Sequence, residues 1–147
     1  MKKLIMVLVL MSAAFAWAED ASDASDVGDQ HSKHLVRVVT NDEGERLLAD
    51  SFSKTLYVFD LDQQKPAPVC TGDCAEVWPP YIVTDAEAAT LKAPLATVAR
   101  ANKKLQLTYQ GRPVYTYIFD RKKGDDMGDG LGGVWHYIEV KDLNLEN

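Results

Sequence analysis

The chain is poor in the residues that carry covalent and acid–base catalysis. It contains two cysteines and three histidines among 147 residues, and no serine or cysteine stands in a recognisable nucleophile motif. A catalytic nucleophile needs an adjacent base, and that base needs an orienting group. Because no such constellation is visible, we expect a non-enzymatic protein that uses no cofactor.

Positive charge is also in short supply. Lys and Arg together number 16 against 22 Asp and Glu, which gives a formal net charge of −6. Nucleic acids and anionic lipid surfaces repel a negative protein. The composition therefore argues against both as partners, and it is equally consistent with simple solubility.

No apolar run is long enough to cross a bilayer, which takes about 20 residues. Residues 4–15 are almost wholly apolar, follow Lys2 and Lys3, and precede the small-x-small sequence of residues 16–18. This pattern is typical of a secretory signal peptide. We therefore expect residues 1–18 to be removed, no transmembrane helix to remain, and the protein to be periplasmic or secreted in a bacterium.

The segment that follows, residues 19–34, is polar and acidic and has no apolar periodicity. This composition predicts a disordered leader. The leader contains His31 and His34, spaced H-x-x-H. Two histidines supply half of a transition-metal site, so they are either weak metal ligands or solvated linker residues.

The most informative feature that is present is an internal repeat. Residues 57–62 and 115–120 both read Y-x-aromatic-x-x-D, and they lie 58 residues apart. Sliding the chain by 58 residues also aligns Leu47 with Leu105, Ala49 with Leu107, and Gly44 with Asn102. Gly and Asn both tolerate the left-handed backbone of a tight turn. Both halves are therefore predicted to follow one plan.

Each half carries three segments with the composition of β-strands, separated by turn residues. They are residues 35–40, 46–49 and 55–61, then 96–100, 104–109 and 113–119, with a closing strand at 134–140. Short helices are expected at residues 84–92 and after Asp73, which would form a capping box with Glu76. We expect an all-β fold with one or two short helices. In it, two antiparallel β-meanders, about 35–82 and 95–140, pack as a single domain over residues 35–147.

The two cysteines, Cys70 and Cys74, are separated by three residues that include Gly72. In an exported protein an isolated pair favours a local structural disulfide. Thioredoxin-like redox pairs have two intervening residues and a βαβ context, which this segment lacks. Redox chemistry is therefore the weaker interpretation.

A loop rich in glycine and aspartate, residues 121–133, is the second candidate site. Clustered carboxylates on bent backbone are typical of calcium loops, but an EF-hand pattern starting at Asp125 would place His136 where a carboxylate is required. His136 itself has no adjacent nucleophile in the sequence. We predict no metal site here, and the weaker metal-ligand candidates are Asp125, Asp126, Asp129 and His136.

The repeated aromatic motif is the third candidate. At strand spacing such residues usually form a core, although tyrosine hydroxyls and aspartates at a shared edge could line a small cleft. The residues of this possible binding edge are Tyr57, Phe59, Asp62, Tyr115, Tyr117, Asp120, Trp78 and Trp135.

These motifs together resemble a bacterial family of secreted repeats. The paired Y-x-[FWY]-x-x-D motifs, Cys70-x-x-x-Cys74 leading to Trp78-Pro79-Pro80, and the late Gly-Leu-Gly-Gly-Val-Trp-His sequence are similar to predicted lipoproteins of that family. The resemblance covers roughly residues 36–140. This chain lacks the cysteine that would carry a lipid, so the resemblance favours a free exported form, and it supplies no catalytic residues to transfer.

The sequence thus predicts a non-enzymatic envelope protein that binds an unknown ligand or protein, or serves a structural role. The alternative is a periplasmic metal-binding or redox accessory protein, which would use the cysteine pair, the acidic loop or the histidines.

Overall fold

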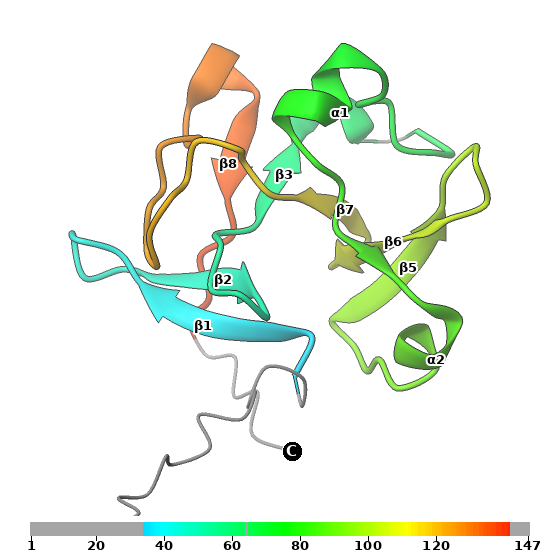
Figure 1. Ribbon diagram of the computed structural model, residues 1–147, viewed down its shortest axis with the longest axis horizontal. Helices are drawn as coiled ribbons and strands as arrows, with labels where there is room; N and C mark the ends of the chain where they lie inside the picture. Colours follow the sequence, from blue (N-terminus) through cyan, green and yellow to red (C-terminus); the bar gives the residue numbers. More distant parts are fainter. Residues whose placement is uncertain (1–33, 64, 142–147) are drawn as a thin grey trace, which may run out of the picture. The chain divides into compact units, whose positions relative to one another are not determined.

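The computed structural model describes residues 34–63 and 65–141, all of which belong to one unit of the chain (Figure 1). The predicted signal peptide, and all of the predicted leader except His34, lie outside these residues. Over the described part, strands predominate and two short α-helices accompany them. The prediction of a mainly-β fold with short helices is therefore confirmed.

Each repeat has three strands followed, after a loop, by a fourth closing strand. The first repeat contains β1 (Val36–Thr40), β2 (Arg46–Asp50), β3 (Tyr57–Phe59), the 3₁₀ turn η1 (Asp60–Asp62), α1 (Asp73–Val77) and β4 (Ile82–Val83). The second contains β5 (Leu95–Ala99), β6 (Leu105–Tyr109), β7 (Arg112–Tyr115), η2 (Leu131–Gly133) and β8 (Trp135–Tyr137). Helix α2 (Asp85–Ala88) connects them. The predicted strands at 55–61 and 113–119 are shorter than expected, because each turns away from the sheet just before its motif aspartate.

The two α-helices begin differently from each other. Helix α2 has a complete capping box, in which Thr84 and Glu87 bond each other's backbone N–H groups. Helix α1 has Gly72 as its N-cap and no side-chain cap, so the predicted capping box of Asp73 and Glu76 is wrong. Asp73 is instead the first helical residue, where its charge still favours the positive end of the helix.

The repeats are joined through their motif strands. β3 and β7 pair antiparallel at the centre of the sheet ordered β4-β6-β7-β3-β8, with Tyr57 opposite Tyr115 and Val58 opposite Val114. Strand β5 pairs with β6 off this path. The meanders therefore meet strand against strand, as well as through packed side chains.

Each repeat gives its closing strand to the other repeat. β8 of the second repeat pairs with β3 of the first, with Phe59 opposite Trp135, and the two strands run side by side in Figure 1. In the reciprocal direction, Pro80 of the first repeat bridges Tyr115 of the second, and β4 pairs with β6. Neither repeat is complete without the last strand of its neighbour.

The pairing register corrects the alignment of the two halves. The pair Val36–Asp50 in the first hairpin corresponds to the pair Leu95–Tyr109 in the second. The number of residues that separates these equivalent positions is one larger than the number that separates Tyr57 in β3 from Tyr115 in β7. Leu48 therefore corresponds to Leu107, and the predicted matches of Leu47 with Leu105 and Ala49 with Leu107 are wrong by one position. Measured between the paired residues Ala49 and Thr55 and the equivalent pair Thr108 and Pro113, the connection in the first repeat is one residue longer than that in the second.

The corrected alignment also changes which residue of the second repeat is equivalent to Gly44. The left-handed residue equivalent to Gly44, with φ +86°, is Lys103, with φ +63°. Both donate their N–H to the carbonyl three residues before, from Gly44 to Asn41 and from Lys103 to Arg100. The expected match of Gly44 with Asn102 is therefore corrected.

The motif strands bury side chains on both faces, as their apolar alternation predicts. Leu56 and Val58 enter an aliphatic core on one face, whereas Tyr57 and Phe59 enter an aromatic core on the other. The buried aliphatic core consists of Val36, Leu48, Leu56, Val58, Val83, Leu107, Val114, Ile138 and Val140.

Candidate functional site

The tyrosines and aspartates of the repeated motif bond across the repeats. The hydroxyl of Tyr57 donates to Asp120 Oδ2 over 2.7 Å, and the hydroxyl of Tyr115 donates to Asp62 Oδ2 over the same distance. The tyrosines are fully buried, Asp120 is only 1% exposed, and Asp62 is 6% exposed. Each motif is therefore completed by the other motif, inside the core.

The second oxygen of each aspartate fixes the loop that follows it. Asp62 Oδ1 accepts the N–H of Val69, and Asp120 Oδ1 accepts the N–H of Met127, in both cases seven residues along the chain. Burial raises the pKa of Asp120 to about 6, against the opposing effect of its hydrogen bond from Tyr57. Burial and the neighbouring aspartate raise the pKa of Tyr57, so this hydroxyl remains a proton donor at neutral pH.

The aromatic residues of the motifs form one continuous stack. The ring centroids of Phe59 and Trp135 are 4.1 Å apart, those of Trp135 and Trp78 are 3.8 Å apart, and those of Trp78 and Tyr117 are 4.3 Å apart. The two tryptophans are nearly parallel, at 3°. Residues of the two repeats alternate along the stack, so each of its contacts joins one repeat to the other.

These positions place the possible binding edge in the core. Its eight residues are buried or, for Tyr117, half-buried, and the hydroxyls of Tyr57 and Tyr115 bond the carboxylates of Asp120 and Asp62. They belong to the core because the two motif strands lie at the centre of the sheet rather than at its rim. Ligand contacts must be sought elsewhere, in the loops that these residues anchor.

The acidic loop closes tightly on the first hairpin. Thr55 Oγ1 donates to the carbonyl of Asp125 over 2.5 Å, and Asn41 Nδ2 donates to Asp126 Oδ2 over 2.9 Å. A Cβ on Gly124, whose φ is +85°, would lie 2.5 Å from the carbonyl oxygen of Thr40. We call this contact, between residues 120–128 and the hairpin β1–β2 with Thr55, the closed junction.

The candidate metal ligands of this loop are engaged separately. Asp125 Oδ2 accepts the N–H groups of Arg121 and Lys122, and Asp129 Oδ1 accepts the N–H of Tyr137. Within residues 34–63 and 65–141, no group of three or more His, Cys, Asp or Glu side chains is placed to hold a metal ion. His34 lies exposed at the start of the described part.

The cysteine loop faces the second hairpin in the equivalent position. Cys70 and Cys74 form a disulfide with a Cα–Cα distance of 5.3 Å, and Cys70 is 1% exposed. The carbonyl of Cys70 accepts Arg100 Nη2 over 2.7 Å, and Arg100 Nη1 donates to the buried Gln106. Clefts lie between other parts of the loop and the hairpin. We call this contact, between residues 62, 63 and 65–70 and the hairpins formed by β5, β6 and β7, the open junction.

Two clefts occupy the open junction, and they meet at Ala67 and Pro68. The larger holds about 410 Å³ and is bounded by Lys65, Val98, Arg112 and Pro113 among others. The smaller holds about 320 Å³ and reaches Arg100 and Asn102. Val98 is half-buried there, whereas its equivalent in the closed junction, Val39, is 1% exposed.

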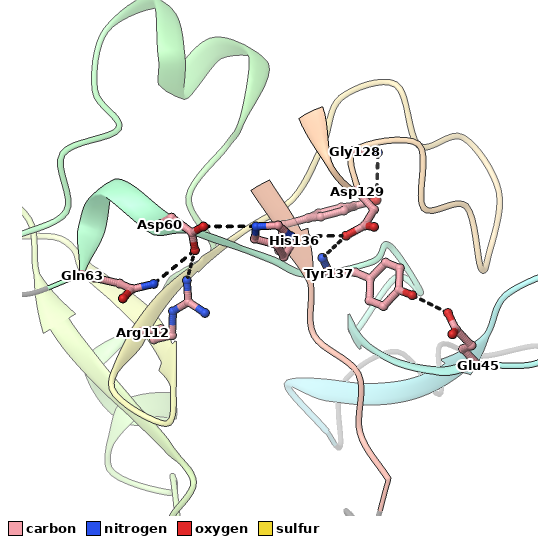
Figure 2. A network of polar contacts seen from close by, with 9 residues as sticks. Glu45, Asp60, Gln63, Arg112, Gly128, Asp129, His136 and Tyr137 are labelled. Atoms are coloured by element: carbon pink, nitrogen blue, oxygen red, sulfur yellow. Dashed lines mark hydrogen bonds and ion pairs between the residues drawn. The ribbon is translucent and has the colours of Figure 1, made fainter. Parts of the chain in front are cut away.

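A polar network borders the larger cleft and links the repeats (Figure 2). Asp60 Oδ1 accepts Arg112 Nη2 over 2.8 Å, and Asp60 Oδ2 lies 3.1 Å from His136 Nε2. The other ring nitrogen of His136 lies 4.0 Å from Asp129. Burial tends to raise the pKa of Asp60, but the hydrogen bonds from Arg112 and His136 outweigh it and lower this pKa below its usual value.

His136 lies between two carboxylates, as Figure 2 shows, and within the described residues no nucleophilic side chain hydrogen-bonds to it. General-base catalysis would need such a group or a bound substrate beside it. Next to this network, the Tyr137 hydroxyl donates to Glu45 and ties the closing strand of the second repeat to the first hairpin.

Sequence reasoning missed Asp60, Arg100 and Arg112. Each is a single charged residue at a strand end or in a turn, where charge is ordinary. The only signal that could have found them is the exchange of strands, which brings Asp60 of the first motif beside β7 and β8.

Comparison with known proteins gives one finding. The search of curated proteins and the search of solved structures produced no significant match. A family model described as a secreted repeat of unknown function matches residues 37–81 and 96–139, which together make up more than half of the chain. The first matched segment is one residue longer than the second, as the extra turn residue between β2 and β3 requires.

No helix in the described part of the chain has the length and apolar character needed to cross a membrane. The matched segments begin within β1 and β5 and end at the exchanged closing strands, so they coincide with the structural repeats. The chain belongs to the family of secreted repeats of unknown function.

Proposed function

We propose that the protein is a non-enzymatic, periplasmic or secreted binding module whose ligand occupies the open junction. The observation that carries the proposal is the difference between two equivalent contacts. The acidic loop bonds Thr55 directly, whereas the cysteine loop leaves a cleft of about 410 Å³ that reaches Pro113, the residue equivalent to Thr55.

The core motif cannot serve as this site because its polar groups are already satisfied. Tyr57, Tyr115, Asp62 and Asp120 bond each other and the loop backbone, and they are inaccessible. Asp62 and Asp120 instead begin the cysteine loop and the acidic loop, and each fixes its loop by accepting a backbone N–H seven residues along. Such a rigid frame with a variable loop is the usual arrangement of binding sites on β scaffolds.

The larger cleft is lined by both polar and apolar residues. Ala67, Pro68, Val98 and Pro113 form apolar surface, and Lys65 and Arg112 add donors. Its volume lies within the range of about 300–1,000 Å³ that is usual for small-molecule sites. A small ligand is therefore the occupant that we expect.

Filling the cleft tests the proposal. Val98→Phe should occlude the larger cleft, and Ala99→Phe is the matched control, since Ala99 is exposed and points to the other side of β5. A panel of short peptides, saccharides and organic acids would be screened by two-dimensional NMR on the folded protein. Compounds that shift the resonances of the cleft should bind the wild type and Ala99→Phe, and lose binding in Val98→Phe. A panel without any cleft binder, or binders indifferent to Val98→Phe, would contradict the proposal.

The same preparation separates this function from the metal-binding and redox alternative. We expect no stoichiometric metal and no reactive thiol in protein taken from its native compartment, because Cys70 is buried in its disulfide. Metal at one equivalent, or two thiols that react without denaturant, would favour the alternative.

A further inference from the structure

The charges around the two junctions differ more than their shapes do. A pocket of about 310 Å³ beside the closed junction is lined by Asp42, Glu43, Asp125 and Asp126. The equivalent pocket beside the open junction has Ala101, Asn102, Ala67 and Pro68 at these positions, and it adds Arg100. The closed junction is thus strongly acidic, and the open junction has no carboxylate at the four equivalent positions.

The larger cleft of the open junction continues this trend. Its cations are Lys65 and Arg112, and its one carboxylate, Asp62, is buried with both oxygens bonded, to the Tyr115 hydroxyl and the Val69 N–H. Positive groups are unexpected here, because the whole chain has a formal net charge of −6. A concave surface that concentrates the minority charge is the usual mark of a site for ligands of the opposite charge.

The guanidinium of Arg112 retains unused donor capacity. Its Nη2 donates to Asp60, which fixes the plane of the group, and the side chain is 36% exposed. Arginine offers five N–H donors in a rigid fork that suits carboxylate and phosphate oxygens. The bond to Asp60 therefore orients the group at the cleft and leaves the remaining donors for a ligand.

On the basis of the proposed function, we infer that the ligand of the open junction is a small organic anion. Its charged group pairs with Arg112 and Lys65, and its apolar part lies against Val98, Pro113 and Pro68. The four carboxylates beside the closed junction exclude the same ligand from the equivalent position, so the protein binds one anion per chain.

Matched pairs of ligands test this class. The probes are straight-chain carboxylates from acetate to decanoate, the corresponding amides, and alkyl phosphates of the same lengths, each titrated by NMR. Carboxylates or phosphates should bind at least about tenfold more tightly than the amides, since charge-assisted hydrogen bonds to arginine contribute about 1.5–3 kcal/mol. The ratio of carboxylate to phosphate affinity then identifies the head group.

Charge variants show whether the cleft itself provides the preference. Lys65→Gln should weaken anion binding about two- to fivefold and leave amide binding unchanged, because an exposed ion pair contributes up to about 1 kcal/mol. Lys92→Gln is the control, since Lys92 is an exposed lysine outside both clefts. Anion affinity should also fall as salt is raised.

The two proposals fail in different ways. If amides and acids bind equally in a cleft that Val98→Phe blocks, the anion inference is wrong and the binding function stands. If no anion perturbs the cleft and neutral ligands do, the inference is again overturned. If nothing in either panel binds there, both proposals fail.

Discussion

The closed and open junctions start from the same anchor and end in different structures. In both, a buried aspartate accepts the tyrosine hydroxyl of the other repeat and the N–H of the residue seven positions on. After the anchor, the acidic loop has Gly124 where the cysteine loop has Pro66, and it meets Thr55 where the cysteine loop meets Pro113.

These substitutions explain the difference physically. Gly124 lets the loop backbone approach Thr40 closely, and no other residue fits at its positive φ without strain. Pro66 and Pro113 have no N–H, and Pro113 lacks the hydroxyl that Thr55 donates to Asp125. The repeat therefore keeps the anchor in both halves and alters the contact that follows it, so that one copy stabilises the fold and the other keeps a cleft.

The largest expected effect comes from the stack that the two halves share. Trp78→Ala and Trp135→Ala should each lower the free energy of unfolding by roughly 3–5 kcal/mol, the range for large aromatic truncations in a core. Because the rings contact each other at 3.8 Å, the double variant should lose less than the sum of the single losses. Urea unfolding of the three variants measures both quantities, and additive losses would show that the rings do not interact.

Adding a side chain at Gly124, where the loop backbone lies close to Thr40, should have the next largest effect. Gly124→Ala places a Cβ 2.5 Å from a backbone oxygen at a positive φ, which should destabilise the protein by roughly 2–4 kcal/mol. The equivalent change in the open junction, Pro66→Ala, should stay within about 0.5 kcal/mol. Chemical denaturation compares the pair, and equal losses would show that the two junctions are equally packed.

The stability of the wild type relative to Asp120→Asn, an uncharged replacement in the closed junction, should depend on pH. The pKa of Asp120 is raised to about 6, so the folded state holds a proton that the unfolded state releases near pH 4. Stability from this group is therefore present at low pH and decreases as the pH rises from about 4 to 6. The difference in unfolding free energy between the wild type and Asp120→Asn should decrease over that range and level off above it. A difference that stays constant would contradict the assignment.

The smallest effect should come from the hydroxyl that closes the acidic loop. Thr55→Val keeps the shape of the side chain and removes its bond to the Asp125 carbonyl, which should cost about 1 kcal/mol. Hydrogen exchange should quicken in residues 121–128 and stay unchanged in the cysteine loop. Faster exchange in both loops would mean that the junctions are not independent.

Much of the fold was predictable because it depends on local patterns. Turn residues and alternating apolar residues predict the hairpins, and the helix near Thr84 follows from its capping residues. The resemblance to the secreted repeats was likewise predictable from motifs, and it is confirmed. The strand exchange was not predictable, because a pattern of apolar residues does not say which edge a strand will join.

The candidate site was less accessible to sequence reasoning for the same reason. Tyr57 and Asp62 of one motif look like neighbours at a strand edge, yet each bonds a residue of the other repeat. Arg112 and Asp60 meet only because β3 lies beside β7. In the open junction, Pro113 has no hydroxyl to make the hydrogen bond that Thr55 makes to the Asp125 carbonyl. The two residues can be recognised as equivalent only when the correct register is known.

The position of β8 near the end of the chain has a consequence for when folding can begin. A polypeptide that emerges from its N-terminus presents β3 early, but the partner that covers one edge of β3 arrives only with Trp135–Tyr137. Long-range pairings of this kind are slow to form and leave the early segments without a stable sheet. The sheet around β3 is therefore completed only after most of the second repeat has been synthesised.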